Sequence, residues 1–139
     1  MKKFYEDEVY IKMCRGAREI QKNYKIPKKG DFIKTNSGIE IVQDYRYEEE
    51  ELIVCCDEPF NFDGEFGMGE FVWLPRQDQL QEMINYNFTI QKLDSKIGAY
   101  YKVEGIASND FIEDTIEKGL LQLTMDMNYN KTWNGEDWV

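Results

Sequence analysis

The stretch that decides the fold class is DFIEDTIEKGLLQLTMDM, residues 110–127. Its apolar residues recur at steps of three and four, at Ile112, Ile116, Leu120, Leu123 and Met127. This spacing places them along one face of an α-helix about four turns long. Asp110 and Glu113 form an acidic variant of the capping box, which predicts that the helix begins near Asp110. We therefore expect a long C-terminal helix.

Two further helices are predicted upstream. Residues 7–25 carry an apolar face at Val9, Met13, Ala17, Ile20 and Tyr24, and this helix must end before Pro27. Pro75 ends a strand, and the following residues 76–84 place Leu80, Met83 and Ile84 on one face of a short central helix.

Short runs rich in Ile, Val, Leu and Phe predict the strands. They lie at residues 31–34, 38–43, 52–56, 71–74, 88–93 and 99–103. The polar residues 46–51 and the glycine-containing residues 59–70 read as breaks between strands. Asn134 and Gly135 predict a tight C-terminal hairpin closed by the indoles of Trp133 and Trp138.

These elements together predict an α+β fold. An antiparallel sheet of about five or six short strands is expected to pack against an N-terminal helix, a short central helix and a long C-terminal helix. The length of 139 residues fits one domain, spanning residues 1–139. The 42% hydrophobic content suffices for a packed core.

The N-terminal residues turn acidic where a signal peptide would turn apolar, and no apolar run approaches the length needed to cross a bilayer. We expect a soluble protein in the cytoplasm that does not bind membranes. The chain contains no histidine, which removes the commonest general base and the commonest zinc ligand. The three cysteines, at 14, 55 and 56, are expected to stay reduced. We therefore predict no enzymatic activity and no cofactor.

Charge is distributed unevenly along the chain. Residues 1–34 hold ten bases and five acids, whereas residues 35–70 hold eleven acids and one base, Arg46. The overall net charge is −10. Such a field repels nucleic acid phosphates and attracts basic protein surfaces. We therefore expect a protein partner with a basic surface and no direct contact with nucleic acid.

The acidic segment is the candidate binding site, because carboxylates interleaved with aromatic residues can compete for Lys and Arg side chains that normally hold phosphates. The predicted partner-binding residues are Glu48, Glu49, Glu50, Glu51, Asp57, Glu58, Asp63, Glu65, Glu70, Tyr45, Tyr47 and Phe66. The competing interpretation is an acidic surface that only keeps the protein soluble. The basic face of the first helix, with Lys12, Arg15, Arg18 and Lys22, is expected to pair with this segment within one chain or in a homo-oligomer.

One metal-like spacing stands out near the C-terminus. Asp126, Asn128, Asn130, Thr132, Asn134 and Asp137 follow the EF-hand calcium loop. Lys131 occupies the position where that loop requires glycine, and it would place a cation beside the metal. We therefore predict no metal site.

Three motifs resemble a widespread group of small phage and prophage proteins of Firmicutes. They are VYIKMC at residues 9–14, WLPRQDQLQEM at residues 73–83 and YNKTWNGEDW at residues 129–138. The resemblance implies a phage origin and a place in the cytoplasm of a host bacterium, but no activity or catalytic residue. It also implies a role that phages give to small acidic proteins, which is blocking host defence enzymes such as CRISPR nucleases.

The sequence thus predicts a phage-encoded accessory protein without enzymatic activity, an anti-defence inhibitor resembling an anti-CRISPR protein. It would bind a basic nucleic-acid-binding or regulatory surface of a host protein. Two alternatives remain open: a sponge for a nucleotide signal, using Arg46, Arg76 and Trp73, or a structural protein of virion assembly. A hydrolase that uses carboxylates and a divalent metal is a further competitor.

Overall fold

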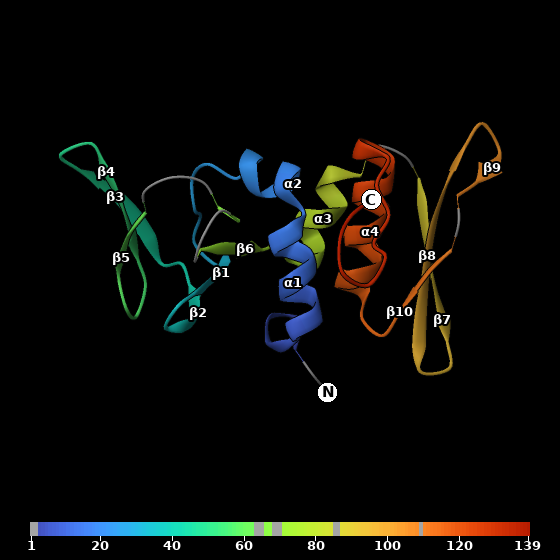
Figure 1. The fold of residues 1–139 in the computed structure, drawn as a ribbon, viewed down its shortest axis with the longest axis horizontal. Coiled ribbons are helices and arrows are strands. Elements are labelled where there is room, and N and C mark those ends of the chain that lie inside the picture. The colour runs from blue at the N-terminus through green and yellow to red at the C-terminus, as the bar shows by residue number, and fades with distance from the viewer. Residues whose placement is uncertain (1–2, 63–65, 68–70, 85–86, 109) are drawn as a thin grey trace. The chain divides into compact units, whose positions relative to one another are not determined.

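The computed structural model describes residues 3–62, 66–67, 71–84, 87–108 and 110–139 (Figure 1). The chain divides into two compact units, Met1–Pro75 and Arg76–Val139. Each unit contains helices and antiparallel strands, which confirms the α+β class. Whether the two units act as one domain stays a prediction.

The first unit begins with helices. They are η1 (Phe4–Glu6), α1 (Glu8–Gly16) and α2 (Arg18–Asn23). Asp7 caps α1, because its carboxylate accepts hydrogen bonds from the backbone N–H groups of Val9 and Tyr10. The single helix predicted over residues 7–25 is broken at Ala17, where ψ is 68°. The break accompanies the burial of two consecutive residues in α2, Ile20 and Gln21.

Two three-stranded antiparallel sheets complete the first unit. The first has the order β2-β1-β6, with β1 (Phe32–Thr35), β2 (Gly38–Ile41) and β6 (Val72–Leu74). The second has the order β3-β4-β5, with β3 (Asp44–Glu48), β4 (Glu51–Cys55) and β5 (Phe60–Phe62). The breaks predicted at residues 46–51 and 59–70 therefore contain strands. All five residues of β3 are exposed, so this strand lacks the apolar run by which a strand is usually recognised.

Helix α2 is joined to β6 by one buried side chain. The Gln21 amide donates to the carbonyl oxygen of Trp73 at 2.7 Å and accepts from its N–H at 2.9 Å. Gln21 thereby bonds to the backbone of β6 along the edge that no strand of the described residues pairs with. The ring of Tyr24 stacks on Trp73 with centroids 4.3 Å apart, and the Tyr24 hydroxyl donates to the buried Asp31.

Replacing Gln21 by Met should destabilise the protein by about 3 kcal/mol, because two buried backbone groups of Trp73 lose their partners. Urea unfolding followed by tryptophan fluorescence measures this loss. Gln43→Met, at an exposed position, is the matched control and should cost less than about 0.5 kcal/mol. Equal losses in the two variants would show that the Gln21 contacts do not stabilise the fold.

The second unit packs helices against a separate antiparallel sheet. Its helices are α3 (Gln77–Met83) and α4 (Ile116–Tyr129), and its strands are β7 (Phe88–Leu93), β8 (Lys96–Val103), β9 (Ile106–Ala107) and β10 (Phe111–Glu113). The sheet order is β10-β8-β7, and β9 also pairs with β8. Helix α4 contacts α3, β8 and β10. Within the described residues there are thus ten strands in three sheets, more than the five or six expected in one.

The start of α4 corrects the sequence prediction. Phe111–Glu113 pairs with β8 as β10, so the helix does not begin at Asp110. It begins at Ile116, and the Thr115 side chain caps it by accepting from the N–H of Lys118. Ile112 therefore lies on a strand and is 56% exposed, whereas Leu120 and Leu123 of the predicted apolar face are fully buried.

The predicted C-terminal hairpin is confirmed. Trp133 and Trp138 form an antiparallel bridge, and their ring centroids lie 5.3 Å apart. Asn134 accepts hydrogen bonds from the N–H groups of Glu136 and Asp137, and Gly135 adopts a φ of 102°. In the part of the chain that the structure describes, no helix is long and apolar enough to cross a membrane.

Polar side chains are half-buried or buried where β10 meets α4. The buried Lys118 forms an ion pair with Asp114, and the Gln122 amide donates to Glu113. Burial raises the pKa of the Glu113 carboxyl, against the lowering effects of Lys118 and of the bond from Gln122. The folded protein therefore binds the Glu113 proton more tightly than the unfolded chain does.

Glu113 should make the protein more stable as pH falls. A raised pKa in the folded state means that stability is gained as pH drops through the folded pKa towards the ordinary value of a glutamate. Replacing Glu113 by Gln should therefore reduce the rise in melting temperature between pH 7 and pH 5. Glu82→Gln, an exposed change on α3, should leave that rise unchanged. A larger rise in the Glu113→Gln protein would contradict the assignment.

Candidate protein-binding site

The candidate site is the β3–β4 hairpin, whose tip carries four glutamates. Glu48 pairs with Glu51 across the hairpin, and Glu49 and Glu50 form the turn with φ values of 50° and 68°. A two-residue turn with both φ values positive is of type I′, which favours Asn and Gly. A residue with a β-carbon in this left-handed region costs roughly 1–2 kcal/mol. The chain therefore holds two glutamates where glycine or asparagine would fit better.

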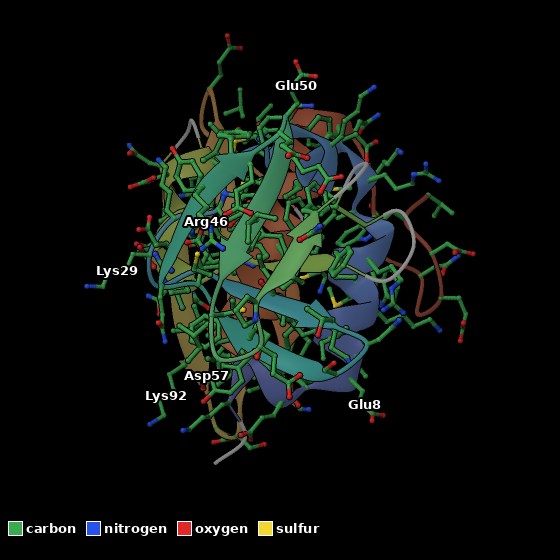
Figure 2. All side chains as sticks on the ribbon, turned by 90° about the vertical axis from the view of Figure 1, so that its left-hand side faces the viewer. Glu8, Lys29, Arg46, Glu50, Asp57 and Lys92 are labelled. Carbon is green, nitrogen blue, oxygen red and sulfur yellow. The ribbon has the colours of Figure 1, made fainter. Side chains whose placement is uncertain are left out.

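The carboxylates of this tip are only partly neutralised. The guanidinium of Arg46 donates to Glu48 at 2.7 Å and to the Cys55 sulfur at 3.2 Å. Figure 2 shows Arg46 along the hairpin and Glu50 at its tip. Because Glu49, Glu50 and Glu51 are exposed, their mutual repulsion is weakened by water and by salt. The tip nevertheless presents a concentrated negative charge to an approaching protein.

Two of the predicted aromatic residues lie beside this charge. Tyr45 and Tyr47 alternate with the charged residues of β3, so both rings lie on one face of the strand. They are 37% and 60% exposed, and their rings meet edge to face with centroids 6.1 Å apart. Exposed tyrosines are common anchors at protein interfaces. The hairpin thus offers an aromatic face and a charged face.

Phe66 does not belong to this surface. Its side chain is 1% exposed and stacks on Phe62 with centroids 4.0 Å apart, and Tyr24 contacts its ring edge to face. Phe66 therefore belongs to the core of the first unit and is inaccessible to a partner in this structure.

The remaining predicted site residues lie away from the tip. Asp57 and Glu58 are exposed beyond the end of β4 opposite the turn, where Figure 2 labels Asp57. Asp57 accepts from the Gln43 side chain at 3.5 Å, and the Glu58 N–H donates to the buried Glu40 at 3.3 Å. Asp63, Glu65 and Glu70 lie outside the described residues. Of the predicted residues, the compact site therefore contains Tyr45, Tyr47, Glu48, Glu49, Glu50 and Glu51.

The sequence prediction left out two residues of the site, Asp44 and Arg46, because it placed no strand at residues 44–48. Both point to the charged face of β3, and Asp44 accepts a hydrogen bond from the N–H of Tyr45 at 2.8 Å. The period-two alternation of DYRYE was the available signal for a strand.

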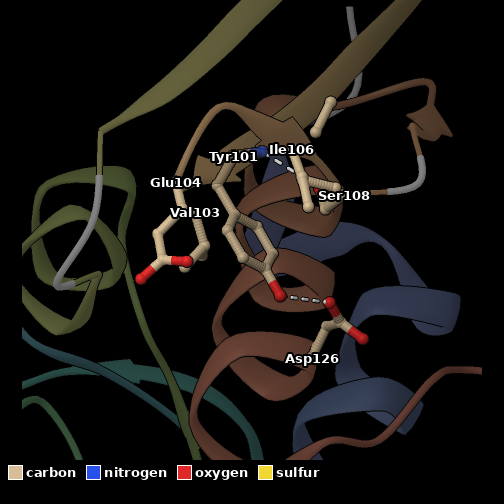
Figure 3. Close-up of a pocket in the computed structure, with 7 residues that line it drawn as sticks. Tyr101, Val103, Glu104, Ile106, Ser108 and Asp126 are labelled. Atoms are coloured by element: carbon tan, nitrogen blue, oxygen red, sulfur yellow. Dashed lines mark hydrogen bonds between the residues drawn. The ribbon is translucent and has the colours of Figure 1, made fainter.

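An open pocket in the second unit has a volume of about 480 Å³ (Figure 3). Among its lining residues, the Tyr101 hydroxyl donates to Asp126 at 2.7 Å. Its remaining lining residues are Val103, Glu104, Ile106, Ala107 and Ser108. Two carboxylates and no base among these residues make the pocket unfavourable for a phosphate.

The residues expected for a nucleotide sponge have other roles. Trp73 is 7% exposed and stacks on Tyr24, so no ligand base can stack on that face. Arg46 is paired with Glu48, and Arg76 with Asp78 at 3.0 Å. These contacts give the sponge alternative no support.

The calcium-loop spacing does not form a loop. Asp126 to Tyr129 still belong to α4, and the Asn134 side chain is turned into the C-terminal hairpin. Across the described residues, no group of three or more Cys, Asp or Glu side chains is arranged to hold a metal ion.

The buried cysteines are poor nucleophiles. Burial raises the pKa of the Cys14 thiol far above its usual range. Burial, with the nearby charge of Glu40 as a smaller cause, raises the pKa of Cys56 to about 11. Neither thiol is therefore ionised to a useful extent near neutral pH.

The basic residues of the first helices are accessible. Lys12, Arg15, Arg18 and Lys22 are exposed on α1 and α2. Their predicted pairing with the acidic segment stays a prediction.

No protein-family model matches this chain, and no curated protein or solved structure matches it either. The assignment of the hairpin as the candidate site therefore depends on its geometry and charge.

Proposed function

We propose that the chain is a binding protein without enzymatic activity, and that its β3–β4 hairpin binds a basic surface of a partner protein. The observation that carries this proposal is the exposed turn in which Glu49 and Glu50 are held at positive φ between Glu48 and Glu51. Strained backbone and adjacent like charges reduce stability, and such features concentrate at functional positions.

The chemistry of the hairpin fits Lys and Arg side chains. Carboxylates form short, charge-assisted hydrogen bonds with these cations, and the net charge of −10 speeds the encounter with a basic surface. Tyr45 and Tyr47 supply large, stiff contact area next to the carboxylates. A partner surface that normally holds nucleic acid phosphates has the matching cations.

In the setting implied by the phage-like motifs, the chain would act as an anti-defence factor in a host bacterium. By occupying the nucleic-acid-binding surface of a host enzyme, it would compete with that enzyme's substrate. An acidic surface that only maintained solubility would require neither the strained turn nor the exposed tyrosines.

Replacing Glu48, Glu49, Glu50 and Glu51 by Gln should weaken partner binding by at least about tenfold at low salt, because the charge-assisted bonds are lost. It should also flatten the salt dependence of binding. Quantitative pull-down from lysate of a host bacterium, at two salt concentrations, measures both effects.

The matched control changes the same number of charges elsewhere. The variant E82Q/D94N/E104Q/D110N removes four exposed acids from the second unit and should retain the proteins bound by the wild type. If the hairpin variant also retains them with unchanged salt dependence, the proposed function is wrong.

A further inference from the structure

Strand β3 is an edge of its sheet. The order β3-β4-β5 leaves β3 with a partner on one side only, and no strand of the described residues pairs with its other side. All five of its residues are exposed. An edge strand presents backbone N–H and C=O groups that another chain can pair with.

The hairpin geometry shows which backbone groups point outwards. The residues flanking a two-residue turn exchange both hydrogen bonds, and bonded pairs alternate with non-bonded pairs along the ladder. Glu48, Arg46 and Asp44 therefore bond to β4, and the bond from the Tyr45 N–H to the Asp44 side chain agrees with this phase. The backbone groups of Tyr45 and Tyr47 consequently point away from β4. The Gln43 N–H donates to the Cys55 carbonyl at 2.8 Å, one residue out of this register, so the ladder is irregular just before β3.

The two outward N–H groups differ. The Tyr45 N–H is covered by the Asp44 carboxylate at 2.8 Å. No described residue covers the Tyr47 N–H on that side. Tyr47 therefore supplies the accessible N–H donor of this edge. The Tyr45 N–H would have to exchange its bond to the Asp44 carboxylate for a carbonyl of the added chain.

We propose that the partner binds by adding an extended segment, rich in Lys or Arg, as an antiparallel strand along the outer edge of β3. This inference rests on the proposed function and specifies its mode of binding. Backbone hydrogen bonds to Tyr45 and Tyr47 provide affinity, and alternate side chains of the added strand provide specificity.

The charges on β3 select the occupant. Arg46 is neutralised by Glu48, which leaves Asp44 and the glutamates of the turn facing an added strand. Cations of the added strand opposite Asp44 and Glu48 would lie beside acids, the position between them faces the Arg46–Glu48 ion pair, and apolar side chains would lie beside the tyrosines. A second copy of the chain brings the same acidic tip and the same net charge, which disfavours it as the occupant.

A peptide of alternating Lys and Val, nine residues long and blocked at both ends, is a suitable probe for the full chain. In the antiparallel pairing, its valines lie opposite Tyr45 and Tyr47 and direct their N–H groups at β3, whereas its lysines direct theirs at solvent. N-methylation of the valines should therefore weaken binding by about tenfold or more, and N-methylation of the lysines should leave it within about twofold. The two methylated peptides carry the same charge. Isothermal titration calorimetry measures the affinities.

A protein variant tests the same contact from the other side. Tyr47→Pro removes the outward N–H, which an edge strand tolerates, and should weaken peptide binding by about tenfold relative to Tyr47→Val. Circular dichroism establishes whether both variants fold. If Tyr47→Pro does not fold, the methylated peptides still test the proposal on the wild-type chain.

The outcomes separate the two proposals. Equal affinity of the two methylated peptides overturns strand addition, as does failure of the unmethylated peptide to bind or self-association of the chain through β3. If replacement of the four glutamates still abolishes partner binding in those cases, the charge-based function stands without strand addition. If it does not, both proposals are wrong.

Discussion

The first unit depends on the side-chain amide of Gln21. Strand β6 has β1 on one side, and its other edge would be buried with unsatisfied backbone groups if Gln21 did not bond to both polar groups of Trp73. The same contact constrains its surroundings. A β-carbon added at Gly67, where φ is +83°, would lie 2.8 Å from the Gln21 side chain. Glycine at position 67 is therefore required for the packing of this segment over Gln21.

Elements fixed by local pattern were predictable from the sequence. The helix α4 follows from the spacing of Leu120 and Leu123, and the C-terminal hairpin follows from Asn134 and Gly135. The burial of α4 is wider than the predicted apolar stripe, because residues 118–125 are all buried. Elements fixed by distant partners were not predictable. The capping pattern at Asp110 predicts a helix start, but Phe111–Glu113 pairs with β8 instead, and the helix begins at Ile116. The role of Gln21 could not be predicted either, because a polar residue on a helix normally indicates its solvent face.

The same distinction applies to the candidate site. Charge counting located the acidic segment, because net charge is a property of the sequence alone. It did not separate exposed from buried aromatic residues. Phe60 and Phe62 of β5 form an aromatic cluster, because Phe60 stacks on Phe71 and Phe62 stacks on Phe66. Tyr45 and Tyr47 instead lie on the edge strand β3. Only the strand pairing decides which aromatic residues face a partner, and β3 was not predicted.

The strained, acidic turn is held in place by the burial of strand β4. Leu52, Ile53 and Val54 are buried, and burial of an aliphatic side chain contributes about 1.5–3 kcal/mol. This burial opposes the cost of roughly 1–2 kcal/mol for each turn glutamate at positive φ. The hairpin therefore holds its carboxylates in a defined arrangement, unlike a loose acidic loop. Because its backbone is already ordered, a partner binding there loses less free energy to the ordering of the chain.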